Sequence, residues 1–185
     1  VGFDNYLGGR LAAQYLLEGG HKRIGIVTGD VAESSAADRR RGFVDAIEQA
    51  GERFDPSLCV AGDYRFASGY RAADRIIDGG ATAVFCCNDV MALGFRQRMA
   101  ERGLHVTEDM QVIGYDNILK RFGLGWRMTT VEQSVGDLAA ACWGMLGSRI
   151  DAVVRGDGDS GAGRPWLASP QVKVLTPKLV QAACA

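Results

Sequence analysis

Short apolar runs and longer stretches with helical spacing alternate along the first 115 residues. The apolar runs, rich in Val, Ile, Phe and Cys, predict strands at 23–29, 57–62, 82–87 and 110–115. Around them, apolar residues recur every three or four positions, which predicts amphipathic helices at 4–18, 35–50, 67–80 and 90–103. In the first helix this spacing puts Leu7, Leu11 and Tyr15 on the inward stripe.

The strands of this region are apolar throughout, which is typical of strands buried on both faces. Strands of that kind, spaced by helices, imply right-handed βαβ crossovers. The sequence therefore predicts an α/β fold: a Rossmann-like, doubly wound parallel sheet with helices on both faces, in three αβα layers.

The alternation then ends. An irregular loop is expected at 116–128, followed by "TTVEQS" and a long amphipathic helix at about 134–155. A loop rich in Gly, Ser and Pro follows at 156–170, and the pattern of 171–180 predicts a closing strand or hairpin. Pro177 within that last segment favours an edge position, because proline cannot donate to a strand ladder.

Composition narrows the class of protein. The chain has 185 residues, of which 47% are hydrophobic and 23% charged, the usual balance of a globular domain. A net charge of -1 gives no sign of a nucleic-acid-binding surface in these residues. No apolar run approaches the ~20 residues that span a bilayer, so we expect no membrane contact.

The cysteines and histidines disfavour a metal site. Five cysteines form no C-x-x-C pair, and there are only two histidines. Three of the thiols sit in apolar runs, so we interpret them as small core residues in a reducing compartment and expect a cytoplasmic protein. The run "GDGDSG" at 156–161 matches a dinucleotide fingerprint but follows a helix instead of a strand, so we predict no cofactor.

Two acidic residues stand at predicted helix starts. Asp4 precedes the first helix and Asp89 precedes the helix at 90–103. Both are predicted to be N-caps, since a carboxylate there accepts from the free N–H groups of the first turn. This leaves Asn88, next to Asp89, as the better candidate for contact with a ligand.

Polar residues follow each predicted strand. In an open parallel sheet, ligands bind at the carboxyl ends of the strands, where helix N-termini also point their free N–H groups. The ligand-binding candidates at these ends are Ser35, Arg39, Tyr64, Asn88, Asp116 and Gln133. Together they suit a polyhydroxylated ligand, with the aromatic ring stacking on a sugar or base face. The set lacks a nucleophile–base pair, so catalysis is not indicated.

Some of these candidates have an equally simple structural interpretation. Arg39 lies in "DRRRGF", which is also consistent with a solvated run of charge. Tyr64 is as consistent with packing as with stacking on a ligand. Asp116 is also consistent with an Asx turn that orders its own loop.

Five segments, in order, carry a resemblance to a known family: "VGFDNYLGGRLAAQYLLEGGHKRIGIVTG", "RRRGFVDAI", "AVFCCNDVMALGF", "EDMQVIGYDN" and "TTVEQ". They resemble the effector-binding domain of the lactose/galactose repressor (LacI/GalR) family of bacterial transcription regulators. The chain departs from the family at "RMTTV", where "PLTTV" is usual, with Trp126 nearby. This departure leaves the conformation of the crossover loop open.

The resemblance implies a periplasmic-binding-protein-like domain of two lobes joined by three crossover strands, with the effector in the cleft between them. Residues 1–132 match the C-terminal lobe, 133–170 match a remnant of the N-terminal lobe, and 171–185 match a return strand to the C-terminal lobe. The first half of the N-terminal lobe and the helix-turn-helix headpiece that binds operator DNA are expected to be absent from this chain.

The resemblance also implies roles for the candidates at the strand ends. Arg39 is expected to grip the ligand, and Tyr64 falls on the family's stacking aromatic. Asn88 and Asp116 fall on hydroxyl-binding positions, and Gln133 on a cleft position at the second crossover.

The implied function is ligand sensing. A small effector, expected to be a sugar, bridges the two lobes, and their closure changes operator binding across a homodimer. One alternative is a periplasmic-type sugar-binding protein of a transport system, which would need a secretion signal. Another is an enzyme or phospho-acceptor domain that uses Asp30, Asp116 and Lys120, which would need an acidic pair around Mg²⁺.

Overall fold

The computed structural model describes residues 1–30, 32–119, 128–155 and 171–182. The predicted loop at 156–170, with its "GDGDSG" run, lies outside these residues, as do Lys120, Trp126 and Cys184. The chain forms two compact units: unit 1 comprises Val1–Asp4 and Ser134–Leu175, and unit 2 comprises Asn5–Gln133 and Thr176–Ala185.

Unit 2 alternates helices and strands. Its elements, in chain order, are α1 (Asn5–Glu18), β2 (Ile24–Thr28), α2 (Ser34–Gln49), the 3₁₀ turn η1 (Pro56–Leu58), β3 (Cys59–Ala61), α3 (Phe66–Asp78), β4 (Ala83–Cys86), α4 (Asp89–Glu101), β5 (Gln111–Asp116), β6 (Thr130–Glu132) and β8 (Lys178–Val180). The eight elements predicted before residue 116 are all present, with ends shifted by one or two residues.

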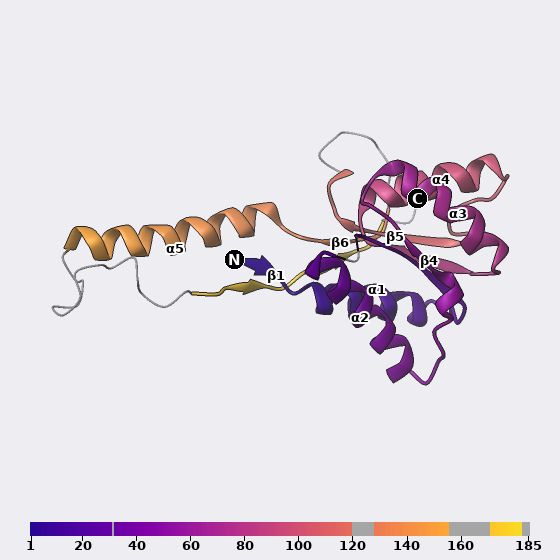
Figure 1. Cartoon of the computed structure of the whole chain (residues 1–185), viewed down its shortest axis with the longest axis horizontal. Helices are drawn as coiled ribbons and strands as arrows, with labels where there is room; N and C mark the ends of the chain where they lie inside the picture. Colours follow the sequence, from indigo (N-terminus) through magenta and orange to yellow (C-terminus); the bar gives the residue numbers. More distant parts are fainter. Residues whose placement is uncertain (31, 120–127, 156–170, 183–185) are drawn as a thin grey trace. The chain divides into compact units, whose positions relative to one another are not determined.

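The sheet of unit 2 has the strand order β3-β2-β4-β5-β6-β8. The first five strands are parallel, and β8 pairs antiparallel with β6. Helices α1 and α2 cover one face and α3 and α4 the other (Figure 1). The predicted doubly wound α/β fold is confirmed. Because β3 and β4 flank β2 on opposite sides, the strand order reverses at β2, which is where such sheets bind ligands.

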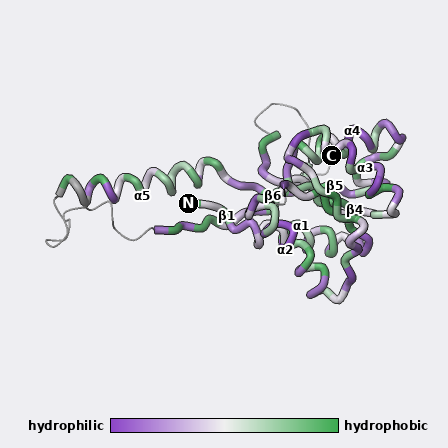
Figure 2. The backbone as a smooth tube through the Cα atoms, viewed as in Figure 1, coloured by the Kyte–Doolittle hydropathy of each residue, from purple (hydrophilic) through white to green (hydrophobic). Residues whose placement is uncertain are grey.

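The core lies along the central strands. Every residue of β2 and β4 is buried. In Figure 2, the tube at β4 and β5 is largely green, the colour of hydrophobic residues. Phe43 of α2 stacks on Phe85 of β4 with ring centres 5.3 Å apart, and Phe85 contacts Tyr115 at 6.1 Å. This row of aromatic rings leads from the core to the carboxyl end of β5.

Helices α1 and α2 cross at a pair of glycines. A Cβ on Gly9 would lie 2.0 Å from the Arg39 carbonyl oxygen, and a Cβ on Gly42 would lie 2.0 Å from that of Tyr6. Only glycine permits so close an approach of the two backbones. It brings the first turn of α1 beside Arg39.

The inward face of α1 differs from the predicted stripe. Leu7, Leu11 and Tyr15 are only half-buried, and the buried residues are instead Gly8, Gly9, Ala12, Ala13 and Leu16. The glycine crossing explains the difference: the helix turns its small residues toward α2, so the larger apolar side chains lie at the margin of the contact.

The three-residue strand β6 lies within "TTVEQS", directly before Gln133, where the resemblance implies a crossover. One strand prediction needs correction. The predicted closing strand at 171–180 is two short strands, β7 (Val174–Leu175) in unit 1 and β8 in unit 2, with Pro177 between them. Strand β8 does lie at the edge of its sheet.

Unit 1 contains β1 (Gly2–Phe3), α5 (Val135–Arg155) and β7. Strand β1 pairs in parallel with β7, with Gly2 opposite Val174. This pairing places Val1–Asp4 in unit 1, whereas the sequence assigns them to the same lobe as residues 5–132. Residues 171–175 likewise belong to unit 1 instead of the predicted return segment.

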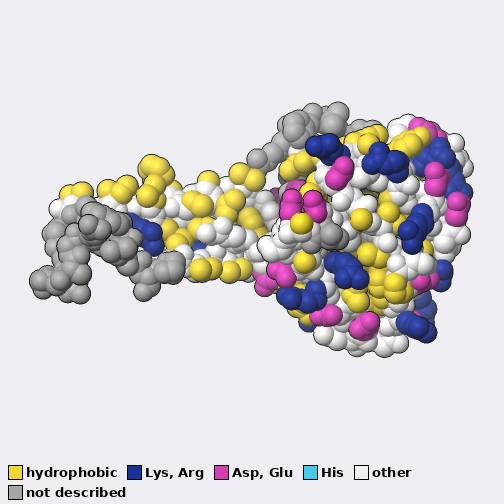
Figure 3. Space-filling view, viewed as in Figure 1, with side chains coloured by type: hydrophobic (Ala, Val, Ile, Leu, Met, Phe, Trp, Pro, Cys, Tyr) yellow, Lys and Arg dark blue, Asp and Glu magenta, His cyan; other side chains and the backbone are white. Residues whose placement is uncertain are grey.

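Helix α5 carries exposed apolar side chains (Figure 3). Trp143 is 75% exposed, and Leu146, Ile150 and Val154 are at least half exposed. The helical spacing of the sequence puts Val135, Leu138, Cys142 and Met145 on one stripe, but Val135 and Cys142 are exposed and Leu138 and Met145 are only half-buried. No helix among the described residues is long and apolar enough to cross a membrane.

Candidate functional site

The carboxyl ends of the parallel strands of unit 2 bring together polar residues that are far apart in the chain. Ser35 and Arg39 lie on α2 after β2, Tyr64 follows β3, and Asn88 follows β4. Asp116 is the last residue of β5, and Gln133 directly follows β6. All six belong to unit 2.

Arg39 is the centre of this arrangement. Its side chain is only 6% exposed, so its charge needs partners. Its Nε donates to Asn5 Oδ1 at 2.9 Å and its Nη1 to the Cys87 carbonyl oxygen at 2.6 Å. The guanidinium carbon lies 3.7 Å from the centre of the Tyr115 ring, a close cation–π contact. Within the described residues, Nη2 has no hydrogen-bond partner.

Asn5 ties Arg39 to the end of β6. Gln133 Nε2 donates to Asn5 Oδ1 at 3.2 Å and to the Tyr115 hydroxyl at 3.3 Å. The Tyr115 hydroxyl in turn lies 3.5 Å from Asn5 Oδ1. Gly8 leaves room for that hydroxyl, because a Cβ there would come within 2.2 Å of it. Asn5 thus receives donors from three other positions of the site.

Sequence reasoning missed Asn5 and Tyr115. Asn5 follows the acidic residue at a helix start and reads as part of the capping sequence. Tyr115 ends an apolar run and reads as core, and its ring is indeed fully buried. The sequence signal that could have identified Tyr115 was its polar hydroxyl near the end of a buried strand.

Tyr64 contacts the same group from the neighbouring strand. Its ring centre lies 6.0 Å from the guanidinium carbon of Arg39, and the ring covers Gly29, where a Cβ would lie 2.0 Å from Tyr64 Cζ. Burial raises the pKa of the Tyr64 hydroxyl, while Ser35 and Arg39 act in the opposite direction. No residue in the described part of the chain gives that hydroxyl a hydrogen bond of ordinary geometry. Ser35 thus acts on the Tyr64 hydroxyl without forming an ordinary hydrogen bond to it.

The structure makes Asn88, instead of the predicted Asp89, the N-cap of α4. Asn88 is the N-cap of α4: its Oδ1 accepts from Met91 N at 2.8 Å, and its Nδ2 donates to the Tyr64 carbonyl oxygen at 2.9 Å. Asp89 is the first helical residue, and its carboxylate accepts from Thr130 instead. The prediction that Asp89 is the cap is wrong, because the helix begins one residue earlier than its apolar spacing suggests.

The side chain of Asn88 consequently makes its hydrogen bonds to the protein itself. It is 6% exposed, and its amide fixes both the start of α4 and the backbone of Tyr64. Its amide therefore fixes the position of Tyr64.

Asp116 has the most perturbed carboxyl group of the site. Burial raises its pKa to about 6, with the charge of Arg39 acting against that rise and the charge of Asp89 adding to it. Its backbone φ is 103°, in the left-handed region. No donor among the described residues reaches the carboxylate. A partly buried carboxylate in this state is suited to accept hydrogen bonds from a ligand.

The other residues singled out from the sequence lie elsewhere or have other partners. Asp30 Oδ1 accepts from Ala32 N at 2.9 Å, so it orders its own turn. Asp4 lies in unit 1, and its capping role stays a prediction. Within the described ranges, no group of three His, Cys, Asp or Glu side chains could hold a metal ion.

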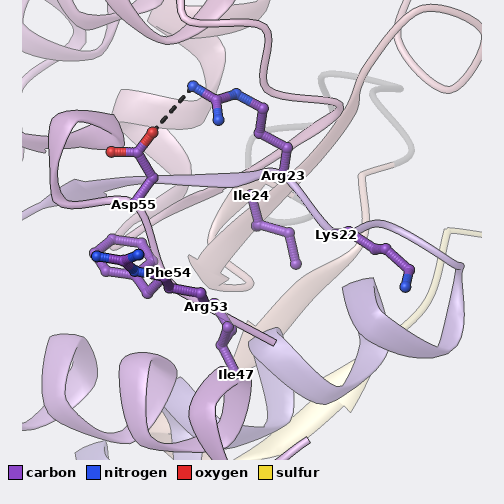
Figure 4. A pocket seen from close by; sticks show the side chains of 7 residues that line it. All are labelled: Lys22, Arg23, Ile24, Ile47, Arg53, Phe54 and Asp55. Carbon is purple, nitrogen blue, oxygen red and sulfur yellow. Dashed lines mark hydrogen bonds and ion pairs between the residues drawn. The ribbon is translucent and has the colours of Figure 1, made fainter. Parts of the chain in front are cut away.

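A separate hollow of about 130 Å³ lies at the amino end of β2 (Figure 4). Buried Ile24, Ile47 and Phe54 form its apolar lining. The Arg23 guanidinium pairs with Asp55 at 3.0 Å beside it. None of the predicted ligand residues lines this hollow, which lies at the opposite end of the strand from Arg39.

We call Asn5, Arg39, Tyr64, Tyr115, Asp116 and Gln133 the Arg39 site. It combines a cation, a carboxylate and two aromatic rings, all at the reversal of strand order. Three of its groups lack a protein partner within the described residues: Arg39 Nη2, the Asp116 carboxylate and the Tyr64 hydroxyl. Such a set recognises a polar ring-shaped molecule by hydrogen bonds at its edge and stacking on its face. It offers no nucleophile paired with a base.

Comparison with known proteins identifies relatives of this chain. Residues 13–173 match the model of the periplasmic binding protein-like domain. The chain is 40% identical over 149 residues to the HTH-type transcriptional repressor PurR of Pasteurella multocida, and 38% identical over 150 residues to PurR of Escherichia coli. These matches cover 80% of this chain but only 45% and 44% of the two repressors. The chain therefore spans less than half the length of these relatives.

Solved structures agree with the sequence matches. The complex of the transcriptional regulator CelR with cellobiose superposes with a TM-score of 0.82 at 28% identity, covering 97% of this chain and 52% of CelR. A LacI family regulator of Enterococcus faecium with bound ribose gives 0.80 at 25% identity, covering 97% of this chain and 62% of the regulator.

Proposed function

Because the chain belongs to the periplasmic binding protein-like domain family, as the effector-binding domain of a LacI/GalR-type transcriptional regulator, we propose that its Arg39 site binds a small polar effector. The observation that carries this proposal is the buried guanidinium of Arg39, held by Asn5 and Cys87 with Nη2 left over. A buried charge with an unused donor costs stability, and groups in such environments cluster at functional sites.

The effector is a sugar or a purine. Cellobiose and ribose occupy two structures that this chain resembles, and the similarity to the PurR repressors favours a purine. The residues support both classes: Asp116 and Arg39 Nη2 pair with hydroxyls or ring nitrogens, and Tyr64 offers a face for stacking. Calorimetric titration with members of both classes decides between them.

In the whole regulator, effector binding changes the affinity for operator DNA. A ligand shifts such an equilibrium only through its different affinities for the two states of the protein. Gln133 and Asn5 stand where the chain passes between unit 2 and unit 1, and both contact the network around Arg39. The Arg39 site is therefore placed to pass the presence of a ligand to the crossing segments. Such a regulator acts on its operator in the cytoplasm.

The transport-type sugar-binding protein and the phospho-acceptor domain receive less support. The curated relatives named above are repressors, and Asp30 is engaged in its own turn. We therefore propose binding, without catalysis, at the Arg39 site.

We propose further that the regulator is a homodimer. In unit 2, Phe66 is the one large apolar side chain among the described residues that is exposed, at 44%, and it stacks on Tyr70 at 6.4 Å. Analytical ultracentrifugation of full-length protein is expected to give a dimer, and Phe66→Glu is expected to weaken it. A Phe66→Glu variant with the wild-type dissociation constant would place the interface elsewhere.

Calorimetric titration of the full-length protein with ribose, cellobiose and adenine tests the binding proposal. One of the two classes is expected to bind, and Arg39→Lys is expected to weaken that binding at least ~10-fold, since lysine cannot reproduce the forked contacts of arginine. Arg40→Lys, a neighbour on the same helix, is the matched control and should bind like the wild type. Equal affinity in both variants would remove Arg39 from the site.

A further inference from the structure

Asp89 is a buried carboxylate with several donors. It is 1% exposed, and burial raises its pKa. Its Oδ1 accepts from the Thr130 hydroxyl at 2.7 Å and its Oδ2 from Ile118 N at 2.8 Å. The backbone N–H groups of Leu119 and Tyr115 also act on this carboxylate and lower its pKa. These donors come from both sides of the turn that follows β5, and from β6.

The turn that Asp89 contacts has an unfavourable backbone. Asp116 and Asn117, neither of them glycine, have φ values of 103° and 57°. Each such residue costs roughly 1–3 kcal/mol and persists only where the surroundings hold it.

The surroundings supply that restraint. A Cβ on Gly114 would come within 2.2 Å of Asp89 Oδ1, so glycine there makes the space for the carboxylate inside the sheet. Asn117 Nδ2 donates to Glu132 Oε1 at 2.9 Å and ties the turn to β6. Asp89 and Asn117 therefore hold the turn from two sides, and Asp89 does so from a fully buried position.

We propose that Asp89 is a positioning residue for ligand binding: its carboxylate holds the left-handed turn at Asp116 and Asn117 and so directs Asp116 into the Arg39 site. This inference rests on the proposed function in one respect, that Asp116 meets the ligand. It assigns to Asp89 a role that differs from the helix cap expected from the sequence.

The two carboxylates are also coupled by charge. The charged and titratable groups that act on Asp116 or respond to it are Arg39, Asp89, Tyr115 and Cys87. Of these, Asp89 is the acid whose charge adds to the raised pKa of Asp116. Loss of the Asp89 charge should therefore lower the pKa of Asp116, an effect that a purely structural residue would not have.

Carbon-13 NMR of aspartate-labelled full-length protein tests the proposal without any effector. Asp116→Asn identifies the Asp116 carboxyl signal, which is then followed from pH 4 to pH 9 in the wild type, Asp89→Asn and Thr130→Val. We expect the midpoint to move to lower pH in Asp89→Asn. Thr130→Val keeps the charge of Asp89 and removes one donor, so the amide signals of Asn117 and Ile118 should move instead. Asp109→Asn removes a carboxylate that lies before β5, at the other end of the strand, and serves as control.

The outcomes separate this inference from the proposed function. An unchanged Asp116 midpoint in Asp89→Asn would overturn the proposal, whether or not the protein binds a sugar or a purine. If Asp89→Asn does not fold, unmoved Asn117 and Ile118 signals in Thr130→Val would overturn it as well. A shifted midpoint in a protein that binds none of the three probes would leave the role of Asp89 standing and contradict the effector proposal alone.

Discussion

The guanidinium carbon of Arg39 lies 3.7 Å from the centre of the Tyr115 ring. Tyr115 directly precedes Asp116 in β5, so one residue of this strand supports the cation of the site and the next supplies its carboxylate. Tyr115 also continues the row of aromatic rings that starts at Phe43. The aromatic row of the hydrophobic core thus ends at the guanidinium of Arg39.

Asn5→Ala is expected to weaken effector binding more than it weakens the fold. The substitution removes the acceptor for Arg39 Nε, and a hydrogen bond to a charged group contributes about 1.5–3 kcal/mol. Arg39 then loses one of its two hydrogen bonds to the protein, so its guanidinium is held less firmly toward the ligand. Calorimetry with the effector found in the screen should show at least ~10-fold weaker binding.

Asn5→Asp provides the matched control. Aspartate keeps an acceptor oxygen at the same place, so the donors from Arg39, Gln133 and Tyr115 all retain a partner. Its affinity should lie nearer to the wild type than to the alanine variant. If both substitutions weaken binding equally, the acceptor at position 5 is not what holds Arg39.

Asp116→Asn is expected to stabilise the protein above pH 6. Burial raises the pKa of Asp116 from 3.8 to about 6. A raised pKa in the folded state means that the stability present below pH 3.8 is lost as the pH rises through about 6. A neutral amide avoids that loss, which amounts to at most about 3 kcal/mol at pH 8. Thermal unfolding should show a higher Tm for Asp116→Asn at pH 8, and a difference that shrinks toward pH 4.

The same substitution should weaken effector binding, because the amide replaces a charged acceptor. Asp30→Asn changes an exposed carboxylate that follows β2 and is the control for both measurements. A Tm gain of equal size at pH 4 and pH 8 would show that the ionisation of Asp116 is not its source.

The fold followed from the sequence because its strands are buried on both faces. Runs such as "TAVFCC" have one plausible environment, the centre of a parallel sheet, and their spacing by helices fixes the topology. The pattern failed where packing depends on small residues. Gly9 and Gly42 set the contact of α1 with α2, and glycine carries no hydropathy signal that would indicate an inward face.

The convergence of Arg39, Asn88 and Asp116 was predictable for the same reason, because parallel strands end at one edge of the sheet. The roles of individual residues were harder. Asn88 and Asp89 are both good caps, and a shift of one residue in the helix start moves the cap from Asp89 to Asn88. Asp89 reveals its task only through Thr130 and Ile118, which lie far away in sequence.

Tyr64→Phe is expected to leave the fold intact and to weaken effector binding. The Tyr64 hydroxyl is buried without a partner in the described part of the chain, so its removal should cost no stability. Gly29→Ala is the complementary change: its Cβ would lie 2.0 Å from Tyr64 Cζ and must displace the whole ring. Affinity should fall further in Gly29→Ala than in Tyr64→Phe. Unaltered binding in Gly29→Ala would exclude the ring from ligand contact.

Asn88→Ala and Asn88→Ser separate the two tasks of the residue that caps α4. Alanine loses both the acceptor for Met91 N and the donor to the Tyr64 carbonyl oxygen. We expect a loss of about 2–4 kcal/mol, combining a lost cap with a partly buried carbonyl left unpaired. Serine caps a helix well but cannot reach the Tyr64 carbonyl, so its loss should be smaller.

Binding distinguishes the variants in a second way. Tyr64 has a φ of 64°, and the amide of Asn88 is the side chain that holds its carbonyl. Asn88→Ser should therefore restore much of the Tm while affinity stays low, because Tyr64 is released in both variants. Urea unfolding and calorimetry on the same preparations measure the two effects. If Asn88→Ser recovers affinity together with stability, Asn88 acts on the ligand only by capping α4, and the contact with Tyr64 is incidental.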